Sequence, residues 1–247
     1  MFFKKQIIYT VLVLIAILGI PSRIIPRKNN FVVSHQKHIE MPLLILTVKS
    51  SANTFQDKRD GKIYRQIKIG NQTWMAENLN YGKLVLNMEQ CDNKQIEKSY
   101  YKNDSLIGKK MGALYTWEEA INYDLPNANT VIQGICPEGW HLPNNSEWEQ
   151  LCTFLDPTAN YKADGWSGKD IALVLIDSSR KTFNSKFAGN AVSNWYFYLN
   201  NMSYYWTSTK YSSASAYYRC LSKDSKKIYK GAGDIKIGMS VRCIKDN

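Results

Sequence analysis

The sequence predicts an α+β domain in which two main helices pack against twisted antiparallel sheets. Three observations lead to this prediction: a hairpin pattern around residue 70, two helix-start signals, and a series of alternating segments near the C terminus. All three fall within residues 60–247. Because an apolar segment precedes them, the chain is expected to consist of a leader, a linker and one folded domain.

The hairpin pattern comes first along the domain. Residues 62–69 alternate polar and apolar side chains, which predicts a strand with its three isoleucines on one face. Gly70 and Asn71 then favour a two-residue hairpin turn, and residues 72–79 are predicted to return as the partner strand. Trp74 lies on this return strand and is predicted to be a core anchor.

Two helix-start signals follow. Thr116 with Glu119, and Ser146 with Glu149, match the capping box, in which each side chain satisfies a free backbone N–H of the other residue. Pro143 prevents a helix from running through the segment before the second start. The residues that recur at helical spacing after this start predict one apolar face: Trp148, Leu151, Cys152 and Leu155.

The connections between these elements are mostly polar. Residues 80–110 are predicted to form a long loop, and Pro126 is expected to end the first helix. Residues 165–168 indicate a turn, and residues 169–176 are apolar enough for a short additional helix.

Four segments near the C terminus alternate apolar or aromatic residues with polar ones, which predicts successive antiparallel strands. They are residues 204–209, 216–222, 226–230 and 238–245. Two aromatic residues inside these strands, Trp206 and Tyr218, are expected to fill the core.

Residues 1–25 have the pattern of a secretory signal peptide or a signal anchor. Two lysines precede an apolar run from Ile7 to Ile20, as in the basic and apolar regions of such a signal. Cleavage near Pro21 would release the protein, whereas retention of the run would attach it to a membrane. Export to the cell envelope or the extracellular space is expected in both cases, with residues 26–59 as a linker.

The formal charge of +11 does not indicate a nucleic-acid partner. Residues 1–55 contain seven Lys or Arg and one acidic residue, so the rest of the chain holds 25 basic and 20 acidic residues. Those charges are interspersed and form no basic stripe along a predicted helix. Nucleic acid is therefore not an expected partner.

Several sequence blocks occur in an order that resembles a known family. CPEGWHLPNNSEW is preceded by GKIYRQIKIGNQTWMAENLNY and GALYTWEEA, and it is followed by YYWTST and GMSVRCIKD. These blocks are similar to the Fibrobacter succinogenes major paralogous domain of bacterial proteins and cover Asp60 to Asp246. The resemblance implies a C-type lectin-like fold, which is related to the formylglycine-generating, sulfatase-modifying enzymes.

The same resemblance implies one disulfide. The lectin-like pattern pairs a cysteine between the two helices with one in the final strand, and Cys136 and Cys243 occupy those positions. Five cysteines in an exported chain agree with at least one disulfide. Cys152 is expected to be a buried thiol, and a bridge between Cys91 and Cys220 is a further alternative.

Catalysis is not expected. The sulfatase-modifying relatives bind copper through two closely spaced cysteines, whereas the comparable region here contains only Cys220. One soft ligand does not make that site, and no phosphate-binding loop, HExxH or GxSxG motif is present. We therefore expect no cofactor and no metal. A divergent enzyme of the formylglycine-generating type is the less favoured alternative.

A segment rich in Tyr, Asn and Trp contains the candidate ligand-binding residues. Tyr gives a large contact area at low entropy cost, and neighbouring amides form adaptable hydrogen bonds. This composition predicts a module that recognises a glycan or a surface protein; the alternative is a structural or adhesive envelope protein without a small-ligand site. Core packing and surface exposure are both open for the aromatic members. The predicted ligand-binding residues are Trp195, Tyr196, Tyr198, Asn200, Asn201 and Tyr211.

Overall fold

The computed structural model describes residues 53–86, 88, 94–126, 130–176 and 182–246. Contacts divide the chain into a first unit, Met1–Ile45, and a second unit, Leu46–Asn247. The first unit lies outside the described residues, and so do the predicted signal or anchor segment and Cys91. All described elements belong to the second unit.

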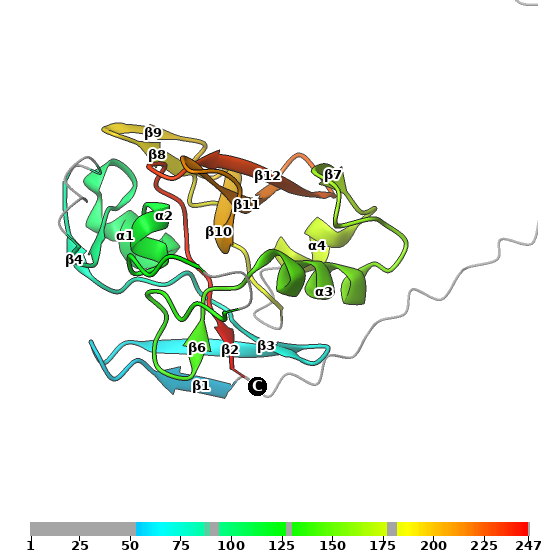
Figure 1. The fold of residues 1–247 in the computed structure, drawn as a ribbon, viewed down its shortest axis with the longest axis horizontal. Coiled ribbons are helices and arrows are strands. Elements are labelled where there is room, and N and C mark those ends of the chain that lie inside the picture. Colours follow the sequence, from blue (N-terminus) through cyan, green and yellow to red (C-terminus); the bar gives the residue numbers. More distant parts are fainter. Residues whose placement is uncertain (1–52, 87, 89–93, 127–129, 177–181, 247) are drawn as a thin grey trace, which may run out of the picture. The chain divides into compact units, whose positions relative to one another are not determined.

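One sheet of this unit has five strands in the order β1-β2-β3-β13-β6 (Figure 1). They are β1 (Asn53–Gln56), β2 (Ile63–Ile69), β3 (Gln72–Met75), β13 (Ile244–Lys245) and β6 (Trp140–His141). Neighbouring strands are antiparallel, and β13 lies between β3 and β6. The first hairpin and the last strand of the domain are therefore hydrogen-bonded to each other.

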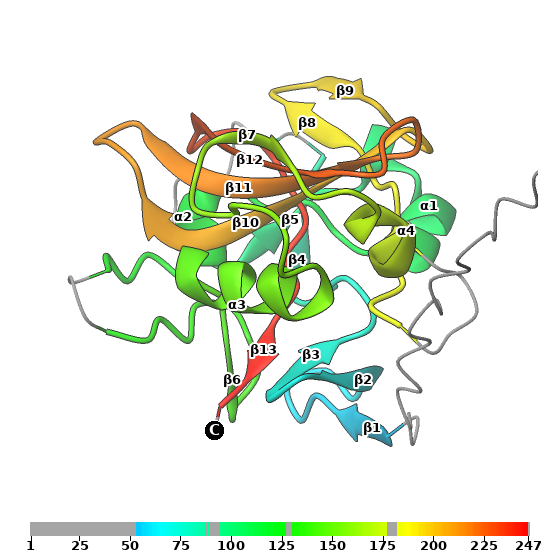
Figure 2. The same ribbon diagram turned by 90° about the vertical axis from the view of Figure 1, so that its right-hand side faces the viewer.

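A second sheet has four strands in the order β10-β11-β12-β7. They are β10 (Met202–Lys210), β11 (Ser215–Ser222), β12 (Ile228–Asp234) and β7 (Gly165–Ser167). The first three confirm the predicted strands. Trp206 is buried as expected, but Tyr218 is only half-buried. Figure 2 shows α3 (Asn145–Leu155) beneath this sheet, with α4 (Ile171–Ile176) beside it.

The remaining elements are short. They are the parallel pair β4 (Lys83–Leu84) and β5 (Glu97–Lys98), a 3-10 turn (Tyr101–Asn103), α1 (Ser105–Met111), α2 (Trp117–Ala120), and the antiparallel pair β8 (Asn190–Val192) and β9 (Trp195–Phe197). Isolated bridges join Gly189 to Ser203 and Ala191 to Gly238. These bridges attach the β8–β9 hairpin to the rest of the domain.

The predicted first hairpin is confirmed, with a shorter return strand. β2 pairs with β3 around Gly70 and Asn71, and Trp74 is fully buried. Ile63, Ile67 and Ile69 lie on one face of β2 as predicted, but the Ile63 side chain is 68% exposed. It lies opposite Gln56 where β2 begins, beyond the residues that cover the middle of the strand.

The first helix start is confirmed at Thr116, whose hydroxyl accepts the Glu119 N–H at 3.3 Å. The predicted end at Pro126 is wrong, since α2 is a single turn. Asn122 and Tyr123 follow it with φ of +54° and +58°. A right-handed helix cannot continue through two residues in the left-handed region.

The second predicted capping box is wrong by two residues. Asn144 and not Ser146 is the N-cap: its Oδ1 accepts the Glu147 N–H at 3.0 Å, and Glu147 Oε2 accepts the Asn144 N–H at 2.8 Å. Asn caps a helix at least as well as Ser, and Asn144 has an extended backbone directly after Pro143. The predicted apolar face of α3 points to the core, where Trp148 is fully buried.

Two connections and the last strand differ from the sequence prediction. Residues 80–110 contain β4, β5 and α1, and α1 begins after Asp104, which accepts the N–H groups of Leu106 and Ile107. Residues 165–168 contribute strand β7 and not only a turn, because β12 offers them an edge for pairing. The last predicted strand is reduced to β13, which joins the five-stranded sheet.

The disulfide between Cys136 and Cys243 is confirmed. It joins the segments that lead into β6 and β13, which are neighbours in the five-stranded sheet. Its cysteines are 107 residues apart, and closure of a loop of that length stabilises a fold by about 4–5 kcal/mol in the chain-entropy model. Cys152 and Cys220 are free and buried.

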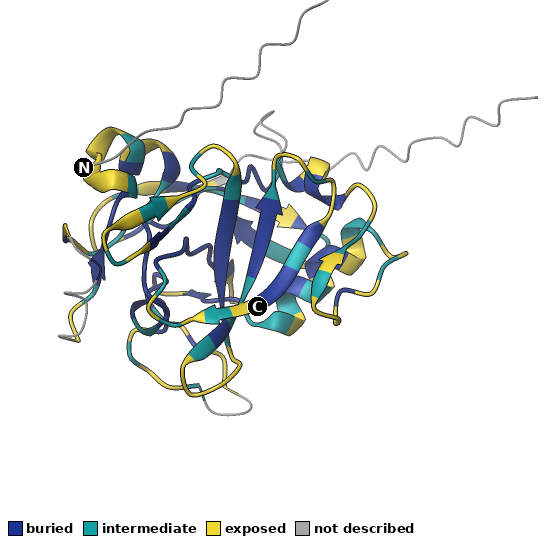
Figure 3. Cartoon of the chain, turned by 90° about the horizontal axis from the view of Figure 1, so that it is seen from above, coloured by how far each residue is buried: buried dark blue, intermediate teal, exposed yellow. Residues whose placement is uncertain are grey.

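Two large clusters of buried side chains form the core. One contains the disulfide together with Trp117 and Trp206, and the other contains Trp74, Trp148 and Phe183. Figure 3 shows the buried strands at the centre and exposed segments around the rim. The core therefore lies where the inner faces of the two sheets meet the helices. The β8–β9 hairpin lies at the edge of the domain.

Candidate ligand-binding surface

The β8–β9 hairpin contains most of the predicted ligand-binding aromatic residues. Its turn places Ser193 at φ +50°, and the register pairs Val192 with Trp195 and Asn190 with Phe197. Val192, Trp195 and Phe197 therefore share one face, because residues opposite each other or two apart lie on the same side of a sheet. These three side chains are 42%, 72% and 41% exposed.

The other face of the hairpin packs on the domain. Ala191 is fully buried, and the ring of Tyr196 lies 5.3 Å from the ring of Tyr101. The Tyr196 hydroxyl donates to Asn103 Oδ1 at 3.0 Å and lies 3.3 Å from Ser99 Oγ. Tyr196 thus holds the hairpin against the domain, whereas its neighbours in sequence face outward.

The turn after β9 extends the exposed face. Tyr198 is 51% exposed, and its carbonyl accepts the N–H groups of Asn201 and Met202 at 3.0 Å. Asn200 adopts φ +62° and donates its N–H to the Phe187 carbonyl at 2.8 Å. The side chains of Asn200 and Asn201 are exposed. We call the following six residues the hairpin patch: Val192, Trp195, Phe197, Tyr198, Asn200 and Asn201.

Tyr211 lies away from the hairpin patch. It follows the last residue of β10, whereas Asn201 precedes the first, and a strand of nine residues is about 30 Å long. Tyr211 is 59% exposed and packs edge-on against Tyr217 at 5.2 Å. The structure therefore gathers the other predicted residues on and beside the hairpin and places Tyr211 at the opposite end of β10.

Two members of the hairpin patch, Val192 and Phe197, are absent from the sequence prediction. Their signal in the sequence is weak, because the two strands of the hairpin have three residues each. A polar pair of residues between two short apolar segments is nevertheless typical of a tight hairpin. That pattern would have placed Phe197 on the same face as Trp195.

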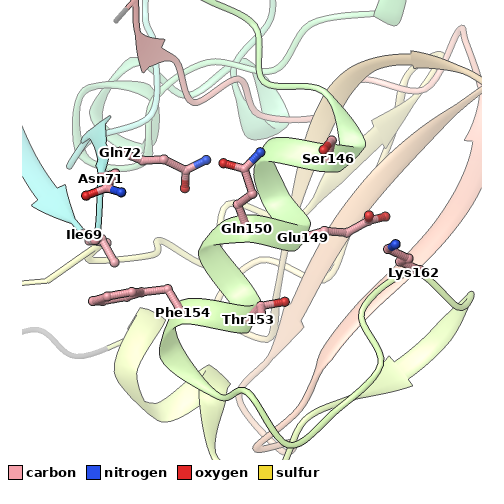
Figure 4. Close-up of a pocket in the computed structure, with 10 residues that line it drawn as sticks. Ile69, Asn71, Gln72, Ser146, Glu149, Gln150, Thr153, Phe154 and Lys162 are labelled. Atoms are coloured by element: carbon pink, nitrogen blue, oxygen red, sulfur yellow. The ribbon is translucent and has the colours of Figure 1, made fainter.

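A separate cavity of about 430 Å³ lies between the β2–β3 turn and α3 (Figure 4). Figure 4 shows Phe154 beside Ile69, with the amide groups of Gln72 and Gln150 facing each other. The Gln72 amide donates to the Glu147 carbonyl at 2.9 Å. One polar group that lines the cavity, the Gln72 amide, therefore already joins the β2–β3 hairpin to α3.

A second cavity of about 660 Å³ shares Ser146 and Glu149 with the first. Glu149 Oε1 lies 3.6 Å from Arg219 and 3.5 Å from Lys230. Burial lowers the pKa of Arg219 from its ordinary value, and the nearby Glu149 carboxylate favours its charged form. Because the acidic group between the cavities is paired within the protein, we favour the hairpin patch as the ligand site.

The family to which the chain belongs follows from comparison with protein-family models. Residues 67–245 match the model of the Fibrobacter succinogenes major domain. The chain belongs to this family. The matched span includes the disulfide, the four-stranded sheet and the hairpin patch. No curated protein and no solved structure matches the chain.

Cys220 of this Fibrobacter succinogenes major domain is a buried free thiol. Its side chain is 1% exposed, and burial raises the pKa of its thiol to about 12. Within the described ranges, no group of three or more His, Cys, Asp and Glu residues is placed to hold a metal ion. Nor does any helix in the described part of the chain have the length and apolarity to span a membrane.

His141 joins the C-terminal segment of the domain to α3. Its Nδ1 lies 2.6 Å from Asp246 Oδ1, and its Nε2 lies 2.6 Å from Glu147 Oε1. Burial by itself would lower the pKa of His141, but the two carboxylates outweigh burial and raise it. Since both ring nitrogens are used inside the protein and the residue is 6% exposed, we interpret His141 as a structural link.

Proposed function

We propose that this domain is a non-catalytic module that binds a glycan on the hairpin patch. The observation that supports the proposal most is the outer face of β8–β9, where Trp195 is 72% exposed between two other exposed apolar side chains. A ligand that covers this face removes apolar surface from water. Tyr196 anchors the other face, so little conformational freedom is lost on binding.

A glycan suits this surface chemically. The C–H groups on one face of a pyranose ring pack against an aromatic ring, and the hydroxyl groups at its edge need hydrogen-bond partners. Trp195 and Tyr198 offer exposed rings, and Asn200 and Asn201 offer amide donors and acceptors close in sequence. All six members of the hairpin patch are uncharged, which favours a neutral ligand.

We further propose a C-type lectin-like architecture and export from the cell. The pairing of β3 with β13 and the bridge between Cys136 and Cys243 support the lectin-like arrangement. Disulfides persist in oxidising compartments, which supports export through residues 1–25 to the cell envelope or the extracellular space.

The test is binding of the full-length protein to an array of neutral glycans. We expect a defined set of glycans to be bound, and Trp195→Ala combined with Tyr198→Ala to remove the binding. Phe154→Ala is the matched control, because Phe154 is a 45% exposed aromatic residue on α3. Circular dichroism checks that each variant is folded. Binding that survives in the hairpin variant and is lost in the control would move the site to the cavity beside α3.

An adhesive role in the envelope is the second candidate. Val192 and Phe197 add exposed apolar surface without polar groups, and such surface suits a protein partner. This role would be favoured by an array without signal, together with adhesion to bacterial surfaces that protease treatment abolishes.

A further inference from the structure

Four residues, one on each strand of the four-stranded sheet, are aligned in register. Tyr204 on β10 pairs with Cys220 on β11, which pairs with Tyr229 on β12, which pairs with Trp166 on β7. Residues in register on neighbouring strands project from the same side of a sheet. The adjacent Tyr205 packs against Trp148 of α3 at 5.7 Å. The line of four therefore lies on the face that is turned away from α3.

A fifth side chain makes this line continuously aromatic. Cys220 is small, and the ring of Tyr218 lies 5.8 Å from the ring of Tyr204 and 5.9 Å from that of Tyr229. Tyr218 therefore fills the gap at Cys220. At the edge strand, the rings of Tyr229 and Trp166 lie 5.3 Å apart. We call Tyr204, Tyr218, Tyr229 and Trp166 the aromatic row.

Two glycines of β12 allow these rings to lie close against the sheet. A Cβ atom at Gly231 would stand 2.5 Å from the ring of Tyr229, and one at Gly233 would stand 3.3 Å from the ring of Tyr218. The rings occupy the space that side chains at these positions would take. The sheet therefore holds them in place before any ligand arrives.

The aromatic row is continuous with the hairpin patch. The rings of Tyr198 and Tyr204 lie 6.2 Å apart. Exposure is greatest at the two ends, 51% at Tyr198 and 41% at Trp166, while Tyr204 is nearly buried and Tyr218 and Tyr229 are half-buried. Three strand spacings separate β10 from β7, which is about 14 Å. The combined surface is longer than one sugar ring.

The aromatic row is electrically neutral. Burial raises the pKa of Tyr218 to about 12 and raises that of Tyr204 further. Both hydroxyl groups are therefore protonated near neutral pH. None of the four rings offers a cation to a phosphate, sulfate or carboxylate group, so the row suits an uncharged polymer.

We propose that the aromatic row extends the hairpin patch into a binding platform for a linear polysaccharide whose pyranose rings are joined by equatorial bonds. The inference rests on the proposed function of the hairpin patch. Equatorial bonds keep successive rings in an extended ribbon that exposes C–H faces along its length. Such a ribbon can meet several rings of a straight row, whereas a chain with axial bonds coils away after one or two sugars.

The experiment is isothermal titration calorimetry of the full-length protein with oligosaccharides of two to six units. The probes are β-linked oligomers of glucose, xylose and N-acetylglucosamine, with α-linked glucose oligomers as the shape control. For at least one β-linked series we expect the association constant to rise with length. Trp166→Ala should weaken binding of the six-unit oligomer about fivefold to tenfold, the effect of one aromatic contact, and leave binding of the two-unit oligomer unchanged.

Two further variants complete the test. Tyr229→Ala should reproduce the length-dependent loss and serves if Trp166→Ala does not fold. Tyr211→Ala removes an exposed tyrosine outside the row and should change nothing. In contrast, Trp195→Ala should weaken binding of short and long oligomers alike.

The outcomes separate the aromatic row from the hairpin patch. If affinity does not rise with length, or if Trp166→Ala and Tyr229→Ala both leave the six-unit oligomer unaffected, the row is not a binding platform. The proposed function still stands in that case, provided that Trp195→Ala weakens binding. An equal rise of the association constant with length in the α-linked series would also overturn the proposal that the row binds an extended polysaccharide. If no oligomer binds at any length, the row is not a binding platform, and a glycan array without signal would in addition overturn a glycan ligand on the hairpin patch.

Discussion

Two hairpins of this domain carry a tryptophan on the second strand and place it in opposite environments. Trp74 on β3 is fully buried, 4.9 Å from the ring of Trp148 and 5.7 Å from that of Phe183. Trp195 on β9 is 72% exposed. Both hairpins have a two-residue turn. The difference lies in what covers them, since α3 packs on the first hairpin and no described element covers the outer face of the second.

The β8–β9 hairpin differs from the β2–β3 hairpin in leaving an aromatic face in contact with water. A rigid hairpin with one anchored face and one exposed aromatic face resembles a core element whose partner is not part of the domain. The covered hairpin contributes to folding, and the uncovered one is available for recognition. Substitutions at the two tryptophans should therefore have different consequences.

The largest expected effect is at Trp74. Trp74→Ala should destabilise the domain by about 3–5 kcal/mol, because it removes a large buried side chain and leaves a cavity. Trp195→Ala should change stability by no more than about 0.5 kcal/mol, since its side chain is mostly in water. Urea unfolding followed by circular dichroism measures both. Similar losses for the two variants would show that the hairpins are not different in the way described.

The next effect concerns the disulfide that joins the segments leading into β6 and β13, the strand that pairs with β3 of the covered hairpin. Replacement of Cys136 and Cys243 by Ser should cost about 2–5 kcal/mol, while ligand binding on the hairpin patch persists below the unfolding transition. Cys152→Ala is the control, because this thiol is free. The comparison between the two regions would fail if the disulfide variant stayed folded but lost binding.

A smaller effect tests the start of α3, the helix that covers Trp74. Asn144→Ala should cost about 1 kcal/mol, because its side chain caps the helix. Ser146→Ala is the control and should stay within about 0.5 kcal/mol. Equal losses of stability at Asn144 and Ser146, measured by urea unfolding, would contradict Asn144 as the N-cap of α3.

The smallest expected effect is the pH dependence from His141, which links α3 to the C-terminal segment after β13. Because the folded protein raises the pKa of His141, protonation of the ring stabilises the fold. This stabilisation is complete below the unfolded-state pKa of about 6.5 and declines as pH rises through the folded-state pKa. The corrected midpoint is the urea concentration at half-unfolding of the wild-type protein minus that of His141→Gln at the same pH. It should fall over that pH range. A corrected midpoint that rises with pH would contradict the link.

Much of the fold could be predicted from the sequence, and the errors have identifiable physical causes. The first hairpin follows from alternation and its Gly-Asn turn, and the buried face of α3 follows from helical spacing. The cap was predicted two residues late because Ser146 and Asn144 both fit the local pattern. Strand β7 was predicted as a turn, since three residues form a strand only where another strand offers its edge.

The candidate site shows the same division. Composition indicated the segment from Asn190 to Tyr218, and the structure places five of its six predicted residues on or directly beside the β8–β9 hairpin. Composition could not separate Tyr196, which anchors the hairpin, from Tyr198, which is exposed. It also could not place Tyr211 at the far end of β10, because residues close in sequence can lie a full strand length apart.

From the sequence alone we could predict the first hairpin, the buried face of α3, the family and, through the family resemblance, the cysteine pair. These depend on neighbouring residues or on motifs whose order is visible along the chain. Only the tertiary structure decided which tryptophan is buried and which is exposed, and that Tyr204, Tyr218, Tyr229 and Trp166 form one row. Burial and cross-strand register depend on contacts between distant segments, and a linear pattern does not contain those contacts.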